Sequence, residues 1–377
     1  MTVHFITGDL LTGRRLQSIP ALAGSWSDVL NGVGDLQCVV PMTSPDVQRL
    51  ELSNSAITGK TFLAAVDGDT VLQAGPIRSH EFSHVNGGQL RLTAGGMWSY
   101  FDRRALLPVL GGRLPSDPTT DTTFRIAEGT ARSYQGIIVA LLQQAMSWPN
   151  GGVPIVLPSP IAGDRERDYR GIDVAPVGQR IRELTQIEDG PDFRLQPRWT
   201  SDRQGIEWVA QIGTPTAPRL SSSIDQIFNV GLADSSVSDL SVDIDGSRLG
   251  SQAFSIGGRA TDEALSAVSL DPKLLDAGFP LWDLVDSAHS TASKASTLQG
   301  YADELVMTGR TSEQSWSFAH NLAQTPYLSA FNVGDFARVR VHESPYLEKG
   351  EHRMRLIARS GDVDGSTVKL NFAPEVI

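Results

Sequence analysis

One short stretch carries residue types at a spacing that could do chemistry. His80, Glu81 and His84 form the pattern H-E-x-x-H, in which two histidines bind zinc and the glutamate acts as base on a zinc-bound water. That chemistry requires a helix, because side chains at i and i+4 of a helix lie within about 6 Å of each other. On a strand the same spacing separates them by roughly 13 Å, which is too far to share one metal ion.

The flanking residues favour a strand over a helix. Pro76 comes just before the stretch, and Asn86-Gly87-Gly88 follows as a tight turn, because Asn-Gly and Gly-Gly supply the positive φ that a hairpin needs. No third ligand follows in a helical register. We therefore predict that both histidines lie on a sheet face, and we keep a zinc-dependent hydrolase as an alternative. From Gly75 to Arg104 the sequence predicts two strands and then an aromatic helix, as at the seam between two domains.

Three acidic groups are weaker candidates for chemistry. They are Asp243 and Asp245 beside Gly246, the pair Glu188-Asp189, and the pair Asp362 and Asp364. The first group resembles part of a calcium loop, but a further acidic ligand at the required spacing is missing, so we expect a hairpin turn. The other two lie in expected turns and are kept as a carboxylate-dependent hydrolase alternative.

The remaining sequence lacks recognisable catalytic patterns. It has no G-x-S-x-G nucleophile elbow in a strand–helix context and no phosphate-binding loop. Its single cysteine, Cys38, cannot form an internal disulfide and is predicted to be a small apolar core residue on a strand. We therefore expect no catalytic, cofactor-binding or metal-ligating residues, and the residues alone favour a non-enzymatic assembly protein.

Composition sets broader limits. The chain has 377 residues, 40% apolar and 20% charged, which is ordinary for a soluble protein of two to four domains. Its net charge of −11 argues against a broad grip on nucleic-acid phosphates or an anionic membrane. Met1–Phe5 lacks the features of a signal peptide, and the longest apolar run, Ile137–Leu142, is too short to span a bilayer. Synthesis in a cytoplasm is expected. Only five of the 32 basic residues are lysine, which indicates a G+C-rich coding genome.

The order of patterns divides the chain into three parts. Residues 1–104 read as about seven short strands and one helix, which fits a small antiparallel barrel or sandwich, and we predict a barrel. Residues 105–216 read as helices beginning at Ser133 and Pro176 followed by a hairpin, an α+β module. Residues 217–377 return to strands, with a helical insertion at about 281–309, and predict a second barrel. The predicted fold is β-rich α+β: two small antiparallel β-barrel domains with an intervening α+β module.

Four stretches, in this order, resemble a known family. They are Gly34–Pro41, Gly75–Arg104, Pro176–Trp208 and the strand entry Val333-Gly334-Asp335. Together they resemble the baseplate hub proteins of phage tails, also called minor tail or tail-tip proteins, of long-tailed phages that infect high-G+C bacteria. The similarity covers nearly the whole chain, and the family has no catalytic residues to carry over.

The resemblance implies a structural protein of the virion tail tip. It implies a homotrimer in which two barrels per subunit form a pseudo-sixfold ring around a channel for DNA, with the α+β modules outside. The implied partners are distal-tail and tail-tube proteins, the tape-measure protein, and tip or receptor-binding proteins, with DNA only in transit. The acidic balance fits such a conduit, since like charge discourages sticking. The alternatives are another tail component, either a distal-tail ring or a receptor- or glycan-binding protein, and the hydrolases above.

Overall fold

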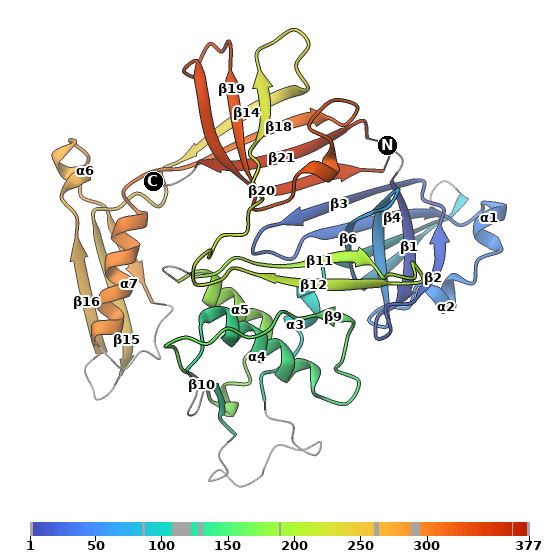
Figure 1. The fold of residues 1–377 in the computed structure, drawn as a ribbon, viewed down its shortest axis with the longest axis horizontal. Coiled ribbons are helices and arrows are strands. Elements are labelled where there is room, and N and C mark those ends of the chain that lie inside the picture. Colours follow the sequence, from blue (N-terminus) through green and yellow to red (C-terminus); the bar gives the residue numbers. More distant parts are fainter. Residues whose placement is uncertain are drawn as a thin grey trace. The chain divides into compact units, whose positions relative to one another are not determined.

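The computed structural model describes residues 3–84, 87–107, 122–126, 131–187, 190–259, 264–287, 295–363 and 365–374, and Figure 1 shows the chain as a ribbon. The chain forms two compact units. Unit 1 holds Met1–Leu240 and Ser317–Ile377, and unit 2 holds Ser241–Trp316. No helix of the described residues is long and apolar enough to cross a membrane.

The first sheet half has the seven strands that the sequence predicts. They are β1 (Val3–Asp9), β2 (Arg15–Ile19), β3 (Ala23–Val29), β4 (Asp35–Pro41), β5 (Thr61–Asp67), β6 (Thr70–Ser83) and β7 (Gln89–Gly95), with the short helices α1 (Pro45–Gln48) and α2 (Leu52–Ser55) between β4 and β5 and α3 (Trp98–Phe101) after β7. Alternate residues of β4 are buried, among them Cys38, which has no exposed surface. The prediction of a strand core position for this cysteine is confirmed.

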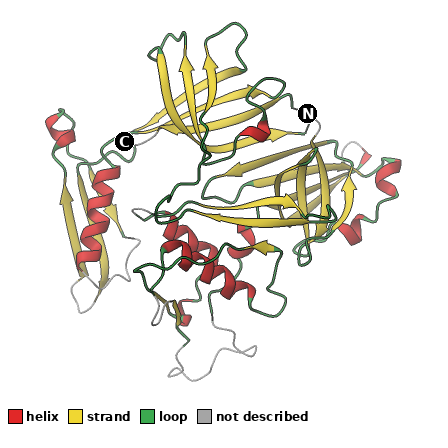
Figure 2. Cartoon of the chain, in the orientation of Figure 1, coloured by secondary structure: helices red, strands yellow, loops and turns green. Residues whose placement is uncertain are grey.

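The α+β module follows, and its core is continuous with that of the first half. Its elements are β8 (Phe124–Ile126), α4 (Tyr134–Met146), β9 (Ile155–Val156), β10 (Arg167–Tyr169), η2 (Gly171–Asp173), α5 (Val177–Thr185), β11 (Phe193–Trp199) and β12 (Ile206–Ile212). The Ser133 hydroxyl accepts the N–H of Gly136 at 3.2 Å and caps α4, as predicted. Figure 2 shows α4 and α5 below the β11–β12 hairpin. The indole of Trp208 donates to the Ala74 carbonyl of β6 at 3.0 Å, which ties the hairpin to the first half.

The second sheet half is built around aromatic rings. Its elements are β13 (Gln226–Val230), β14 (Val237–Asp245), β18 (Glu313–Asn321), η3 (Leu328–Ala330), β19 (Phe336–Val341), β20 (Gly350–Asp362) and β21 (Thr367–Pro374). The ring centroids of Phe318 and Phe372 lie 5.0 Å apart, and Phe228 lies 5.4 Å from the first and 5.7 Å from the second. These rings bury the large apolar area on which this half depends.

The two halves form one sheet instead of two barrels. Its 13 strands follow the order β14-β18-β21-β20-β3-β4-β7-β6-β5-β1-β2, and β19 pairs with β20 and with β13. Within the described residues neither half closes on itself, so the prediction of two separate closed barrels is wrong. The physical reason lies in β20, whose 13 residues pair with β19 and β21 and, at the far end, with β3 of the first half. The β-rich α+β class is confirmed, as one large, mainly antiparallel sheet.

The two halves repeat one strand arrangement. The order β3-β4-β7-β6-β5 in the first half corresponds to β14-β18-β21-β20-β19 in the second. The long central strands even share a bulge: the β6–β7 register shifts between Ile77 and Ser79, and the β20–β21 register shifts between Leu356 and Ala358.

Matching hydrogen bonds confirm this equivalence. The N–H of Gly59 donates to the carbonyl of Ile77 at 2.8 Å, and the N–H of Gly334 donates to that of Leu356 at 2.7 Å. Both glycines have positive φ, 75° and 99°. Because the bulge and the bond occur at the same positions, Ile77 of β6 is the structural equivalent of Leu356 of β20.

Unit 2 is a small sheet covered by a helix. It contains β15 (Gln252–Arg259), β16 (Ala264–Leu270), α6 (Lys273–Asp276), β17 (Asp283–Asp286) and α7 (Ala295–Thr308), with strand order β16-β15-β17. The predicted helical insertion holds for α7, but residues 283–286 form a strand because they pair in parallel with β15. The hairpin turn expected at Asp243, Asp245 and Gly246 is also wrong, since β15, the strand that follows it, pairs with β16 and β17.

Candidate assembly site

The H-E-x-x-H residues lie on and just beyond β6. His80 Nδ1 is 3.0 Å from the Thr58 hydroxyl, and the Glu81 carboxylate is 3.8 Å from the Arg91 guanidinium of β7. His84 follows the end of the strand. The prediction of a strand is confirmed, and the three groups have different neighbours. Among the described residues there is no group of three or more His, Cys, Asp or Glu that could hold a metal ion.

The acidic candidates that the structure describes are not brought together either. Asp243 and Asp245 belong to β14, and the Asp245 carboxylate accepts the N–H of Ser247 at 2.7 Å, a turn contact that lowers the pKa of that carboxyl. Asp362 is the last residue of β20. Glu188-Asp189 and Asp364 lie outside the described residues.

One surface hollow offers space without acid–base chemistry. It has a volume of about 430 Å³ and is lined by residues of the turns after β5 and β11, by the first residues of β6 and by strand β11. Its charged groups are exposed, and Arg203 pairs with Asp69 at 2.7 Å. This contact raises the pKa of Arg203, while the Thr200 hydroxyl lowers the pKa of Asp202. Both groups are therefore held in their ordinary charged forms and are unsuited to proton transfer near neutral pH.

A buried charged cluster instead marks the junction of the two halves. β3 and β20 pair antiparallel from Ser25–Asp362 to Val29–Ala358. Across this junction the Arg359 guanidinium lies 3.2 Å from the Asp28 carboxylate and donates to the Phe331 carbonyl at 2.9 Å. Only 4% of Arg359 is exposed.

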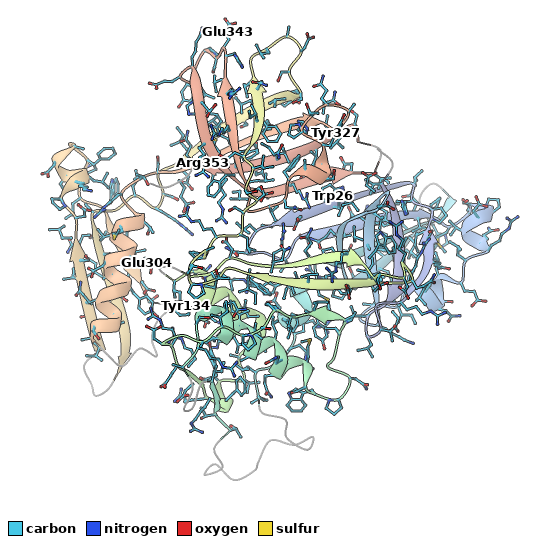
Figure 3. The ribbon with its side chains drawn as sticks, in the orientation of Figure 1. Trp26, Tyr134, Glu304, Tyr327, Glu343 and Arg353 are labelled. Carbon is cyan, nitrogen blue, oxygen red and sulfur yellow. The ribbon has the colours of Figure 1, made fainter. Side chains whose placement is uncertain are left out.

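An aromatic ring covers the same guanidinium. Arg359 lies 5.9 Å from the ring centroid of Trp26, which Figure 3 labels where β3 meets the second half. A buried ion pair with further hydrogen bonds fixes one geometry, because either charge alone would be strongly unfavourable there.

Two further contacts bind the α+β module into this junction. Arg194 of β11 is buried and donates to the Val333 carbonyl at 3.1 Å and to the Gln211 side chain at 3.0 Å. Burial lowers the pKa of Arg194, but arginine remains charged in proteins. Asp192, just before β11, pairs with Arg355 of β20 and accepts the side-chain amide of Asn31 at 3.1 Å. The junction therefore joins both sheet halves and the module.

The turn at the strand entry Val333-Gly334-Asp335, which the sequence singled out, supplies backbone for these contacts. The Asp335 carboxylate accepts the N–H of Asn332 at 2.7 Å and the N–H of Ser222 at 2.6 Å. Sequence reasoning located this turn but did not single out Arg194, Arg355 or Arg359. Their strands carry other charged residues as well, such as Glu351 and Arg353 in β20, so the sequence offered no signal that set these three apart.

The fold is shared with solved tail proteins. No family model and no curated protein matches the sequence. The tail protein from Neisseria meningitidis MC58 is 12% identical and superimposes with a TM-score of 0.56, covering 99% of this chain and 96% of that chain. The 43 kDa tail protein of prophage MuSo2 from Shewanella oneidensis is 10% identical with a TM-score of 0.59, covering 99% and 98%. At such identities the similarity establishes the fold. The resemblance to tail proteins is thus confirmed at the level of the fold.

Proposed function

We propose that this chain is a structural hub protein of a phage tail tip, which joins the tail tube to the tip and surrounds a channel for DNA. The observation that carries the proposal is the internal repeat: two equivalent sheet halves joined edge to edge through β20 and β3. The shared fold with two tail proteins supports it. Residues 1–104 and 217–377 would be the ring-forming parts and 105–216 the peripheral module.

The repeat explains how a trimer could make a ring with near-sixfold symmetry. Each chain supplies two equivalent halves, so three chains supply six. Head-to-tail contacts between copies close into a ring when the rotation fits, and the ring leaves a channel on its axis. The net charge of −11 per chain would repel DNA phosphates and keep the channel surface from retaining DNA.

The proposed role implies a location and neighbours. The protein would be made in the host cytoplasm and carried in the virion at the tail tip, without enzymatic activity. Its partners would be distal-tail and tube proteins on one side, tip or receptor-binding proteins on the other, and the tape-measure protein. The proposed host class, high-G+C bacteria, rests on the small number of lysines alone.

The mass of the full-length protein in solution tests this function. Light scattering should give about three times the chain mass of 40.6 kDa, and electron micrographs should show rings with a central hole. A monomer at all concentrations tested would contradict the hub. A ring of six chains would favour the distal-tail alternative, since that protein would supply one ring unit per copy.

A further inference from the structure

The three-stranded sheet of unit 2 has one face that a helix covers. α7 packs on β15 and β16, and Figure 2 shows this helix running along the strands. Ala253 and Ser255 of β15 have no exposed surface, which places them on the side of the helix. Because successive side chains of a strand point to opposite faces of the sheet, the residues between them point away from α7.

The opposite face, called here the outer face, carries larger apolar side chains. Phe254 of β15 lies beside Val268 of β16 and Val285 of β17, so these three form one row across the sheet. The exposed fractions of Ile256, Val268, Leu270 and Val285 are 39%, 50%, 60% and 64%. Single exposed apolar residues are ordinary, but a contiguous group of them on one face marks an interaction surface.

The charge of unit 2 indicates which partner would suit this surface. Residues 241–316 contain eleven acidic and five basic residues, a net charge of −6 out of −11 for the whole chain. Among the described residues of the outer face the one charged side chain is Asp283, which is exposed on β17. A second copy would bring the same negative charge, so like charge opposes the pairing of two outer faces. A basic partner is complementary.

The dimensions of the outer face fit one helix. Three strands about 4.8 Å apart give a face about 10 Å wide, and a helix with its side chains is about 10–12 Å in diameter. α7 shows the same fit on the other face, where its 14 residues extend over about 21 Å. A partner strand would instead pair at an edge of the sheet and leave the outer face uncovered.

We propose that the outer face of unit 2 binds an amphipathic helix of a partner protein, with an apolar stripe flanked by lysine or arginine. The two helices would then cover both faces of one sheet, which is a common way to bury a sheet with two apolar faces. Contact with Phe254, Val268 and Val285 would supply affinity, and the acidic charge of unit 2 would select a basic partner over an acidic one. The inference goes beyond the proposed hub role and does not depend on it.

A synthetic peptide of the length of α7 tests the chemistry of the partner. The probe carries leucine at positions i, i+3, i+4 and i+7 and lysine elsewhere, so that it has one apolar face as a helix. Fluorescence anisotropy of the labelled peptide should show saturable binding to the full-length protein, weakened by added salt. The same peptide with glutamate in place of lysine should not bind. Equal binding of both peptides, or no binding of the lysine peptide, would overturn the proposal.

A pair of threonine substitutions tests the location. Val268→Thr combined with Val285→Thr keeps the branched shape that suits a strand and leaves the net charge unchanged. Affinity for the lysine peptide should fall by about tenfold or more, because a covered hydroxyl would lack a hydrogen-bond partner. Met307→Gln is the matched control, since Met307 is 55% exposed on α7, and it should bind as the wild type does. Circular dichroism checks that both variants fold.

A cysteine variant tests the competing occupant, a second copy of this chain. Val285→Cys places a thiol on the outer face, and Met307→Cys places one on α7 as the control; the buried Cys38 should not react. Under mild oxidation without peptide, neither variant should give more covalent dimers than the other. Preferential dimers from Val285→Cys would show that two outer faces meet, and would overturn the proposal.

The outcomes separate this inference from the proposed function. A wild-type protein that forms trimers but binds both peptides alike, or binds the threonine variant as tightly as the wild type, leaves the hub intact and refutes the helix site. A wild-type protein that stays monomeric yet binds the lysine peptide through Val268 and Val285 refutes the hub and supports the site.

Discussion

Replacing Arg359 with alanine should strongly destabilise the junction between the two sheet halves. The side chain of Asp28 is 13% exposed and that of Arg359 is 4% exposed, and their charged groups lie 3.2 Å apart. The substitution would leave the carboxylate of Asp28 buried without its cation. It would also leave the Phe331 carbonyl without the donor that now lies at 2.9 Å.

The expected magnitude follows from this burial. Removing one partner of a buried ion pair typically costs about 3–5 kcal/mol of unfolding free energy, because the remaining charge is neither solvated nor paired. A matched exposed pair is Arg198–Glu207 on the β11–β12 hairpin, at 2.8 Å with 56% and 25% of the side chains exposed. Arg198→Ala should cost below about 1 kcal/mol, because water replaces the lost partner.

Urea unfolding, monitored by tryptophan fluorescence, would measure the loss of unfolding free energy in Arg359→Ala and in Arg198→Ala. The protein concentration must be held fixed, because oligomerisation shifts apparent stability. The double variant Arg359→Met with Asp28→Leu removes both charges and should recover about half or more of the Arg359→Ala loss. The reasoning would be refuted if Arg359→Ala cost no more than Arg198→Ala. It would also fail if the double variant were less stable than Arg359→Ala.

Three further predictions concern single residues. Gly334→Ala should destabilise the protein more than Gly59→Ala. Both glycines have positive φ, which costs other residues about 1–2 kcal/mol, but only at Gly334 would the added Cβ approach backbone, 2.6 Å from the Leu220 carbonyl oxygen. Equal urea midpoints for the two variants would contradict this prediction. Burial lowers the pKa of His320 in the folded protein. As the pH falls, the unfolded chain therefore protonates this imidazole before the folded protein does, and stability should fall below about pH 6.5. His320→Gln should show a weaker decline of melting temperature between pH 7 and pH 5, and an unchanged decline would count against it. Burial raises the pKa of the Cys38 thiol to about 12, so a thiol reagent should label it only as the protein unfolds, and rapid labelling of the native protein would disprove this.

Local features of the fold follow from local sequence. The turn signal Asn86-Gly87-Gly88 and Pro76 excluded a helix over the H-E-x-x-H residues, and the structure has β6 there. The hydroxyl of Ser133 caps α4 as its position before an apolar run indicates. These predictions hold because the interactions involved join residues within a few positions of each other.

The helical insertion shows where local reasoning fails. Residues 283–286 were expected to be helical, yet they form β17 because β15 offers a strand edge on which to pair in parallel. A short apolar stretch fits a helix or a strand equally well by periodicity. The neighbouring strand, which the local sequence does not specify, decided between them.

In strands such as β4 and β12 the sequence by itself determined which residues are buried, since alternation of apolar and polar side chains sets the faces of a sheet. Only the tertiary structure decided which edges meet, and therefore that the two halves form one open sheet and not two barrels. Asp28 and Arg359 stand 331 positions apart, and the edges on which they lie are made of peptide N–H and C=O groups that every residue except proline presents alike. Side-chain pattern can specify a face, but the choice of a partner edge depends on strand length, bulges and the packing of the whole molecule.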